Sequence, residues 1–151
     1  NFKEDEKLNK LNHSCAHLLA QAVKHLYPQA KFWVGPVVEE GFYYDVNPGE
    51  GIKFDEAILP KIENEMKRLV AGDHKFVRIE VSRSEALEMF KDDEYKLDLI
   101  NNMDENDTVI TAYRQEDFTD LCRGPHVEST KVIKFFKLIK SFYFTHLIPP
   151  I

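Results

Sequence analysis

Two short motifs, far apart in the chain, carry side chains that could form one reactive centre. The first is a His-x-x-x-His pair, His13 and His17, and the second is the Cys-Arg-Gly-Pro-His stretch that begins at Cys122 and ends at His126. In an α-helix, residues four apart lie on one face, so the two histidines of the first motif can point at the same spot. Imidazoles exchange protons near neutral pH. We therefore interpret the four side chains as the active site of a small hydrolytic domain.

The same residue types also suit a metal ion, because imidazole nitrogen and thiolate sulfur are the ligands that Zn²⁺ prefers. The first motif lacks the glutamate of the His-Glu-x-x-His signature, so a metalloprotease mechanism is disfavoured. Taken alone, His13 and His17 also fit two solvated side chains on an exposed helix face. The second motif argues against this alternative, since Pro125 prevents Cys122 and His126 from lying in a plain helical turn.

The first motif lies in a stretch, from about Glu6 to Tyr27, that has the spacing of an amphipathic helix. Its apolar stripe consists of Leu8, Leu11, Cys15, Leu18, Leu19, Ala22, Val23 and Leu26. At about 100° per residue, His13 and His17 lie about 155–165° from the centre of that stripe. Cys15 lies on the stripe and is therefore predicted to be a core residue. Pro28 is expected to end the helix.

The rest of the chain predicts short strands and helices in irregular order. Strands are expected over 32–34, 37–44, 76–81, 108–113, 118–121 and 131–144, and helices from near Asp55 to Gly72, from Ser82 to Phe90 and around 95–97. Without regular βαβ alternation, this indicates an α+β fold, in which a mixed, mostly antiparallel sheet packs against helices. Asp120 would share one side of its strand with Cys122 and could orient a histidine or a water molecule. On spacing alone, it fits an ordinary strand-end aspartate equally well.

The composition restricts the class of protein. The chain has 151 residues, 43% of them hydrophobic and 30% charged, as is typical of one soluble globular domain. Two cysteines are too few for a disulfide framework, so we expect a cytoplasmic protein. The formal net charge of −6 argues against a free-standing, non-specific binder of nucleic acid. No apolar run approaches the length that spans a bilayer, so no membrane partner is expected.

Three segments resemble the editing domain, or second additional domain, of bacterial threonyl-tRNA synthetases. They are Asn12–Ala22, Gly35–Asp45 and Asp120–Val127. The same domain type occurs in alanyl-tRNA synthetases and in free-standing editing proteins. The likeness predicts a tRNA-editing domain over residues 1–140, whereas residues 141–151 form a tail that does not match the family. We accordingly expect an excised or truncated editing module, without a site for ATP-dependent aminoacylation.

The resemblance implies that the domain hydrolyses seryl-tRNA(Thr), the product of mischarging with serine. Its expected partners are the acceptor end of tRNA(Thr) carrying serine and the remainder of the synthetase. The resemblance assigns His13, Lys96 and Asp120 to the editing pocket, and we expect these three residues to be catalytic. In this hypothesis His13 is the base or water-positioner, Lys96 stabilises the developing oxyanion or the ribose oxygen, and Asp120 orients water or the amino group of serine. Lys96 has no local signal of its own. The residues implied to bind substrate are His17, Tyr44, Cys122 and His126.

Several alternatives remain open. In the threonyl branch the residues of the two motifs are taken to act directly on substrate and water, so we expect no obligatory cofactor. The first alternative is a zinc-dependent aminoacyl-tRNA hydrolase of the alanyl type, with zinc held by His13, His17, Cys122 and His126. The second is a non-catalytic module that only binds the tRNA acceptor end. The third is a structural metal domain that needs the same four side chains to fold.

Overall fold

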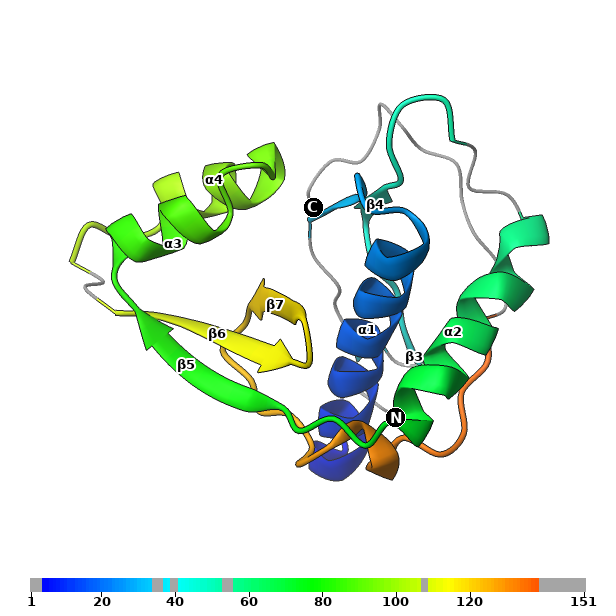
Figure 1. Cartoon of the computed structure of the whole chain (residues 1–151). Helices are drawn as coiled ribbons and strands as arrows, with labels where there is room; N and C mark the ends of the chain where they lie inside the picture. The colour runs from blue at the N-terminus through cyan, green and yellow to red at the C-terminus, as the bar shows by residue number, and fades with distance from the viewer. Residues whose placement is uncertain (1–3, 34–36, 39–40, 53–55, 107–108, 139–151) are drawn as a thin grey trace.

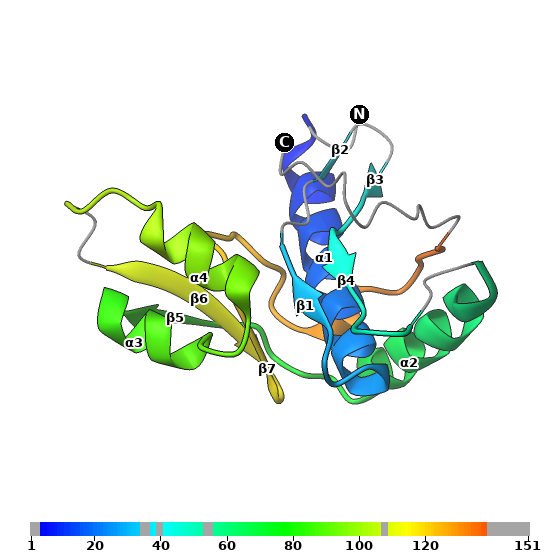
Figure 2. The ribbon, with the colours of Figure 1, turned by 90° about the horizontal axis from the view of Figure 1, so that it is seen from above.

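Helix α1 (Glu6–Leu26) lies at the centre of the structure, between helix α2 (Leu59–Ala71) and a three-stranded sheet (Figures 1 and 2). The computed structural model describes residues 4–33, 37–38, 41–52, 56–106 and 109–138. The helix begins where predicted, because the side chain of Asp5 caps it by accepting a hydrogen bond of 3.0 Å from the Leu8 amide. It ends directly before Tyr27 and Pro28.

The three-stranded sheet is an antiparallel meander in the order β5-β6-β7. Its strands are β5 (Val77–Val81), β6 (Ile110–Gln115) and β7 (Phe118–Leu121). Helices α3 (Arg83–Met89) and α4 (Glu94–Asn101) follow β5 and lie against this sheet (Figure 2). The predicted capping box of α3 is present, with reciprocal bonds between Ser82 and Glu85.

Two further sheets have only two short strands each, and both are antiparallel. Strand β1 (Lys31–Phe32) pairs with β4 (Val46–Asn47), and β2 (Val37–Val38) pairs with β3 (Gly41–Phe42). The sequence predicted two longer strands here. The predicted α+β class with antiparallel sheets and packed helices is confirmed.

Helix α1 is buried on two sides, which excludes the solvated-histidine alternative. Its apolar stripe packs against α2, where Leu18, Val23 and Met66 are fully buried. On the opposite side, His17 is only 3% exposed. There the side-chain amide of Gln115 on β6 donates a hydrogen bond of 3.0 Å to the His17 carbonyl. The histidine face therefore packs on the sheet instead of facing solvent.

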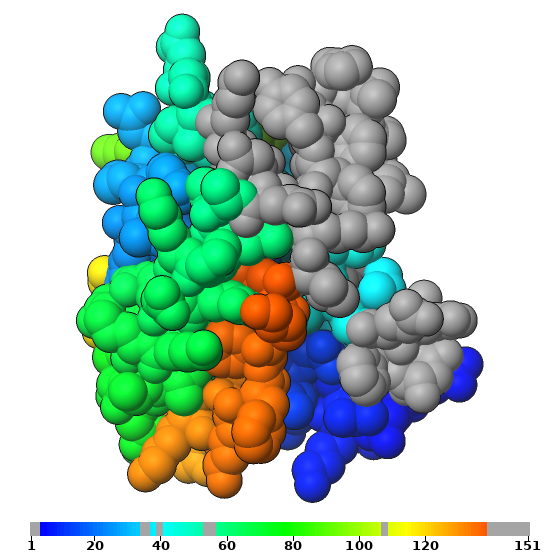
Figure 3. All heavy atoms as spheres, turned by 90° about the vertical axis from the view of Figure 1, so that its right-hand side faces the viewer, coloured from blue at the N-terminus to red at the C-terminus, as the bar shows by residue number. Residues whose placement is uncertain are grey.

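The strand predicted over residues 131–144 is wrong for the part that the structure describes. Residues Thr130–Val132 form a 3-10 turn, and 133–138 run along α2 without strand pairing (Figure 3). The carboxylate of Glu63 on α2 explains this course, because it accepts a hydrogen bond of 2.6 Å from the Leu138 amide and lies 3.3 Å from the Lys137 ammonium. Residues 139–144 and the predicted tail, 141–151, lie outside the described residues.

The start predicted for the second helix near Asp55 also lies outside the described residues. A 3-10 turn, Glu56–Ile58, precedes α2, and Pro60 lies in the first turn of that helix, where the missing amide hydrogen is tolerated. Among the described helices, none has both the length and the apolar character needed to cross a membrane.

A cluster of charged side chains joins the β6–β7 turn to helices α1 and α2. The imidazole of His25 lies 2.7 Å from Glu65 on α2 and 2.9 Å from Asp117 in the turn. Glu65 also binds the guanidinium of Arg68, and Glu116 lies 3.9 Å from His25. Burial disfavours the imidazolium, but the hydrogen bonds that His25 donates to Asp117 and Glu65 outweigh this effect and raise the pKa of His25.

This raised pKa predicts the sign of one pH effect on stability. Because the pKa is higher in the folded chain than in the unfolded one, the contribution of His25 is fully present below about pH 6.5 and is lost as pH rises through the folded value. We expect the free energy of unfolding of wild type to exceed that of His25→Gln by at most about 1 kcal/mol at low pH, because the cluster is partly exposed. Urea unfolding at several pH values measures the difference, and an identical pH slope in both proteins would contradict it.

Candidate active site

The structure brings the two predicted motifs together between α1 and the end of β7. One nitrogen of each histidine and the sulfur of Cys122 all lie within 4.8 Å of one another, in the group His13, His17, Cys122 and His126. The Cys122 Sγ atom lies 3.4 Å from Nε2 of His13 and 3.2 Å from Nε2 of His126. Two motifs that are more than a hundred residues apart in the sequence therefore form one centre of four side chains.

Aromatic rings and a glycine shape the loop that carries Cys122 and His126. The His126 ring stacks on Phe76, with centroids 5.1 Å apart, and meets Tyr113 edge-on at 4.5 Å. Gly124 adopts φ +74°, in the left-handed region, and its amide donates a hydrogen bond of 3.2 Å to Cys122 Sγ. A Cβ atom on Gly124 would collide with the Tyr113 side chain. Only glycine fits this position without a shift of its surroundings.

A buried ion pair adjoins the histidine centre. Lys96 on α4 lies 2.7 Å from Asp120 on β7, and the two side chains are only 4% and 2% exposed. The Tyr44 hydroxyl donates to the other carboxylate oxygen of Asp120. The Lys96 ammonium also donates a hydrogen bond of 2.9 Å to the carbonyl of Trp33. The structure therefore gathers Lys96, Asp120 and Tyr44 as one polar group.

The three imidazoles of the centre are held neutral near pH 7. Burial is the main cause in each case. Burial lowers the pKa of His13, and the hydrogen bond to the Pro125 carbonyl and the charge of Asp120 partly offset this effect. It lowers the pKa of His17 well below its ordinary value, and that of His126 to about 2, with the neighbouring histidines adding to the effect. Each neutral ring retains one nitrogen lone pair that can accept a proton or bind a metal ion.

The thiol of Cys122 is also neutral. Burial raises its pKa to about 11, although the Gly124 amide acts in the opposite direction. The charge of Asp120 raises this pKa further, whereas Lys96 lowers it. A protonated thiol is a poor nucleophile, so Cys122 is better suited to shaping the site than to attacking a substrate.

The four-residue group fits a zinc ion by donor type and by spacing. Tetrahedral zinc with bonds of about 2.0–2.3 Å places its ligand atoms about 3.3–3.6 Å apart. The distance from Cys122 Sγ to Nε2 of His13, 3.4 Å, lies within this range, and the distance to Nε2 of His126, 3.2 Å, lies just below it. A catalytic zinc site has three protein ligands and one open position. If all four side chains bound the ion, the site would be closed and structural.

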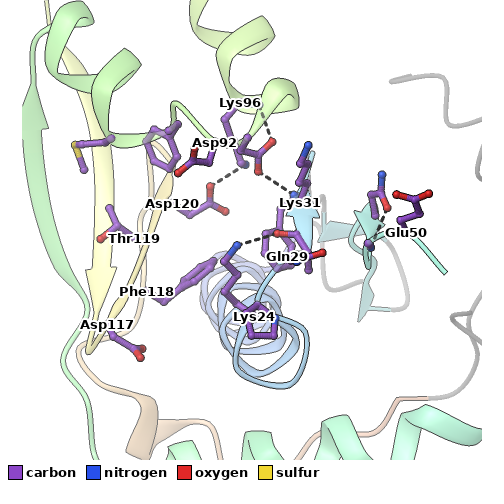
Figure 4. A pocket seen from close by; sticks show the side chains of 18 residues that line it. Lys24, Gln29, Lys31, Glu50, Asp92, Lys96, Asp117, Phe118, Thr119 and Asp120 are labelled. Carbon is purple, nitrogen blue, oxygen red and sulfur yellow. Dashed lines mark hydrogen bonds and ion pairs between the residues drawn. The ribbon is translucent and has the colours of Figure 1, made fainter. Parts of the chain in front are cut away.

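A cleft of about 930 Å³ lies on one side of the ion pair (Figure 4). Its walls come from β7 with Phe118 and Thr119, from the segment that follows α1, and from the start of α4. Lys96 and Asp120 line the cleft, but none of the three histidines of the centre does. Since Lys96 also acts electrostatically on His17 and Cys122, the ion pair connects the cleft with the histidine centre.

Sequence reasoning missed several residues that contact the centre. Tyr113 lies opposite Asp120 in the register of β6 and β7, so the strand pattern could have placed both on one face of the sheet. Phe76 and Ser14 approach His126 from other elements, and their positions carry no comparable sequence signal.

Comparison with known proteins adds independent information. Residues 110–141 match the family model of the threonyl and alanyl tRNA synthetase second additional domain. Threonine–tRNA ligases of Acholeplasma laidlawii and Staphylococcus carnosus are 51% and 53% identical to the chain over 137 residues. A Porphyromonas gingivalis threonine–tRNA ligase is 50% identical over 142 residues. Each alignment covers 91% of this chain but 21% of the relative, so the chain spans about a fifth of their length. The predicted resemblance to the second additional domain of threonyl-tRNA synthetases is confirmed.

The geometry at Gly124 predicts a specific loss of stability. Gly51 offers a matched control, because its φ is +79° and a Cβ atom there would meet open space. We expect both Gly51→Ala and Gly124→Ala to lose about 1–2 kcal/mol from backbone strain. Gly124→Ala should lose about 1–3 kcal/mol more, because the methyl group collides with Tyr113. Urea unfolding of the two variants measures these losses, and equal values would contradict the collision.

Proposed function

We propose that this chain is a proofreading domain that hydrolyses seryl-tRNA(Thr) for a threonyl-tRNA synthetase. The observation that carries the proposal is the placement of three neutral imidazoles beside the buried pair of Lys96 and Asp120. The similarity to threonine–tRNA ligases supports the biological setting. The partners in this proposal are the seryl-bearing acceptor end of tRNA(Thr) and the remainder of the synthetase.

Such a synthetase needs a second site for a physical reason. Serine lacks only one methyl group of threonine, and a difference of this size gives a binding site only about 1–3 kcal/mol of discrimination. An editing pocket that admits serine but is too narrow for threonine adds a second selection step. The substrate-binding role belongs to His17, Tyr44, Cys122 and His126, whose buried or half-buried side chains would form the narrow walls.

The proposed reaction is ester hydrolysis. A water oxygen attacks the carbonyl carbon of the seryl ester, and the carbonyl oxygen becomes an oxyanion. The bond between that carbon and the ribose oxygen then breaks, and the ribose oxygen takes up the proton that the water gave to the base. His13 is the proposed base, because it is neutral and half-buried and so retains access to an incoming water. The products are serine and tRNA(Thr).

The ion pair of Lys96 and Asp120 is proposed to stabilise the negative charge that develops on the carbonyl oxygen. In the described part of the chain, the Lys96 ammonium directs two of its three N–H bonds to Asp120 and the Trp33 carbonyl. The third remains for the developing oxyanion, which a fixed positive charge stabilises strongly in a site shielded from water. Asp120 holds the ammonium in place and can also orient water or the amino group of serine.

A zinc-dependent hydrolysis is the second candidate, favoured by four nitrogen and sulfur atoms that lie within 4.8 Å of one another. Three of the side chains His13, His17, Cys122 and His126 would hold the ion and would leave its fourth position open. A zinc ion supplies a bound water of lowered pKa.

Deacylation assays distinguish the two mechanisms. We expect the chain to release serine from seryl-tRNA(Thr) and to leave threonyl-tRNA(Thr) intact, with the same rate in the presence of a chelator. Loss of the activity with chelator, restored by zinc, would support the second candidate instead. Equal hydrolysis of both substrates, or binding of the acceptor end without hydrolysis, would contradict the proposed function.

Removal of the proposed base tests the mechanism. His13→Ala should lower the rate of seryl-tRNA(Thr) hydrolysis by about 10²–10⁴-fold, the usual contribution of a general base, while the far-ultraviolet circular dichroism stays unchanged. His74→Ala is the matched control, because His74 pairs with Glu116 outside this centre. Full activity of His13→Ala would exclude the assignment. Unfolding of that variant would favour a structural metal site.

A further inference from the structure

The hydroxyl of Ser14 lies at a junction between the two motifs, and the reaction proposed above does not use it. Ser14 is completely buried. Its Oγ atom makes three polar contacts, each of 2.9 Å, with the Lys10 carbonyl, with Nδ1 of His126 and with the Val127 amide. One hydroxyl thus links the helix that carries His13 and His17 to the loop that ends in His126.

The chemistry of these three partners decides where the protons lie. A hydroxyl has one proton to donate and two lone pairs to accept with. The Lys10 carbonyl can only accept, so it takes the hydroxyl proton, and the Val127 amide can only donate. The remaining lone pair of Oγ faces His126, and therefore Nδ1 of His126 must carry a hydrogen. The reverse arrangement would leave two oxygen atoms 2.9 Å apart in a buried place without a proton between them.

The hydrogen on Nδ1 leaves Nε2 of a neutral His126 ring without one. Phe76 and Tyr113 hold the plane of this ring, and the bond to Ser14 selects which edge faces the helix. The bare Nε2 atom then points at the centre of the site, 3.2 Å from Cys122 Sγ. A fixed acceptor at this position suits an N–H or O–H donor, such as the ammonium or hydroxyl group of a seryl ester.

We propose that Ser14 is a positioning residue that holds His126 in the Nδ1–H tautomer and so presents its Nε2 lone pair to the substrate. The consequence for catalysis rests on the proposed function. The assignment of the tautomer rests only on the hydrogen bonds around Ser14. The tautomer assignment and the catalytic role can therefore be refuted separately.

Nitrogen-15 NMR of the histidine rings in this chain tests the tautomer directly. In wild type, we expect a protonated, pyrrole-type Nδ1 and a pyridine-type Nε2 in His126. In Ser14→Ala the acceptor for Nδ1–H is lost, so the pyridine-type signal should move to Nδ1. Ser14→Thr keeps the hydroxyl and should restore the wild-type pattern. A wild-type His126 with its proton on Nε2 would overturn the proposal before any variant is made.

The same proteins are then assayed for seryl-tRNA(Thr) hydrolysis. Ser14→Ala should lose about 10–100-fold in rate, as is usual when a group that orients a site histidine is removed. Ser82→Ala is the matched control, since it removes a serine that caps α3 by bonding with Glu85 and costs stability without changing the hydrogen bonds of His126. Full activity of Ser14→Ala with the tautomer switched would overturn the positioning role. A wild type with the expected tautomer but without hydrolysis would refute the proposed function and leave the tautomer assignment standing.

Discussion

The buried ion pair between Lys96 and Asp120 is the interaction on which the arrangement of the site depends. Two charges that are 4% and 2% exposed persist only when each satisfies the other, and removal of one partner typically costs about 3–5 kcal/mol. The pair joins α4 to β7, and the Trp33 carbonyl and Tyr44 hydroxyl complete its hydrogen bonds. The segments around β1 and β3 are therefore tied to the meander through the same two charges. Loss of either charge would therefore weaken the contacts of α4 and β7 with the segments that carry Trp33 and Tyr44.

The pair lies where two separate apolar cores meet. One core joins α1 and α2 around Leu18 and Met66, and the smaller one lies between the meander and helices α3 and α4 around Ile100. Asp93 reinforces the junction, because its carboxylate caps α4 and also accepts a hydrogen bond from the Phe32 amide on β1. The polar residues of the candidate site thus fill the contact between two stable bodies.

Local signals in the sequence were sufficient for the elements that form by local rules. Helix α1, its end before Pro28 and the capping box at Ser82 agree with the predictions, because caps and apolar periodicity act over a few residues. The strand predicted from residue 131 is absent over residues 131–138. There the carboxylate of Glu63, which is distant in the sequence, accepts a hydrogen bond from the Leu138 amide and holds the segment against α2. The convergence of His13 with Cys122 could be expected from residue types, but the approach of Lys96 could not, since α4 is placed by contacts far apart in sequence. The resemblance to a known family supplied Lys96 and Tyr44.

Zinc binding and the proposed proton transfer require the same lone pairs. Buried neutral imidazoles suit either role, so their low pKa values alone do not choose between them. If all four side chains bound an ion, His13 would lose the lone pair that it needs as a base, and no ligand position would remain for water. A metal held by all four would therefore inhibit the reaction proposed here. Wherever His13 is one of the ligands, the two mechanisms exclude each other, because its single lone pair cannot both bind the ion and accept a proton.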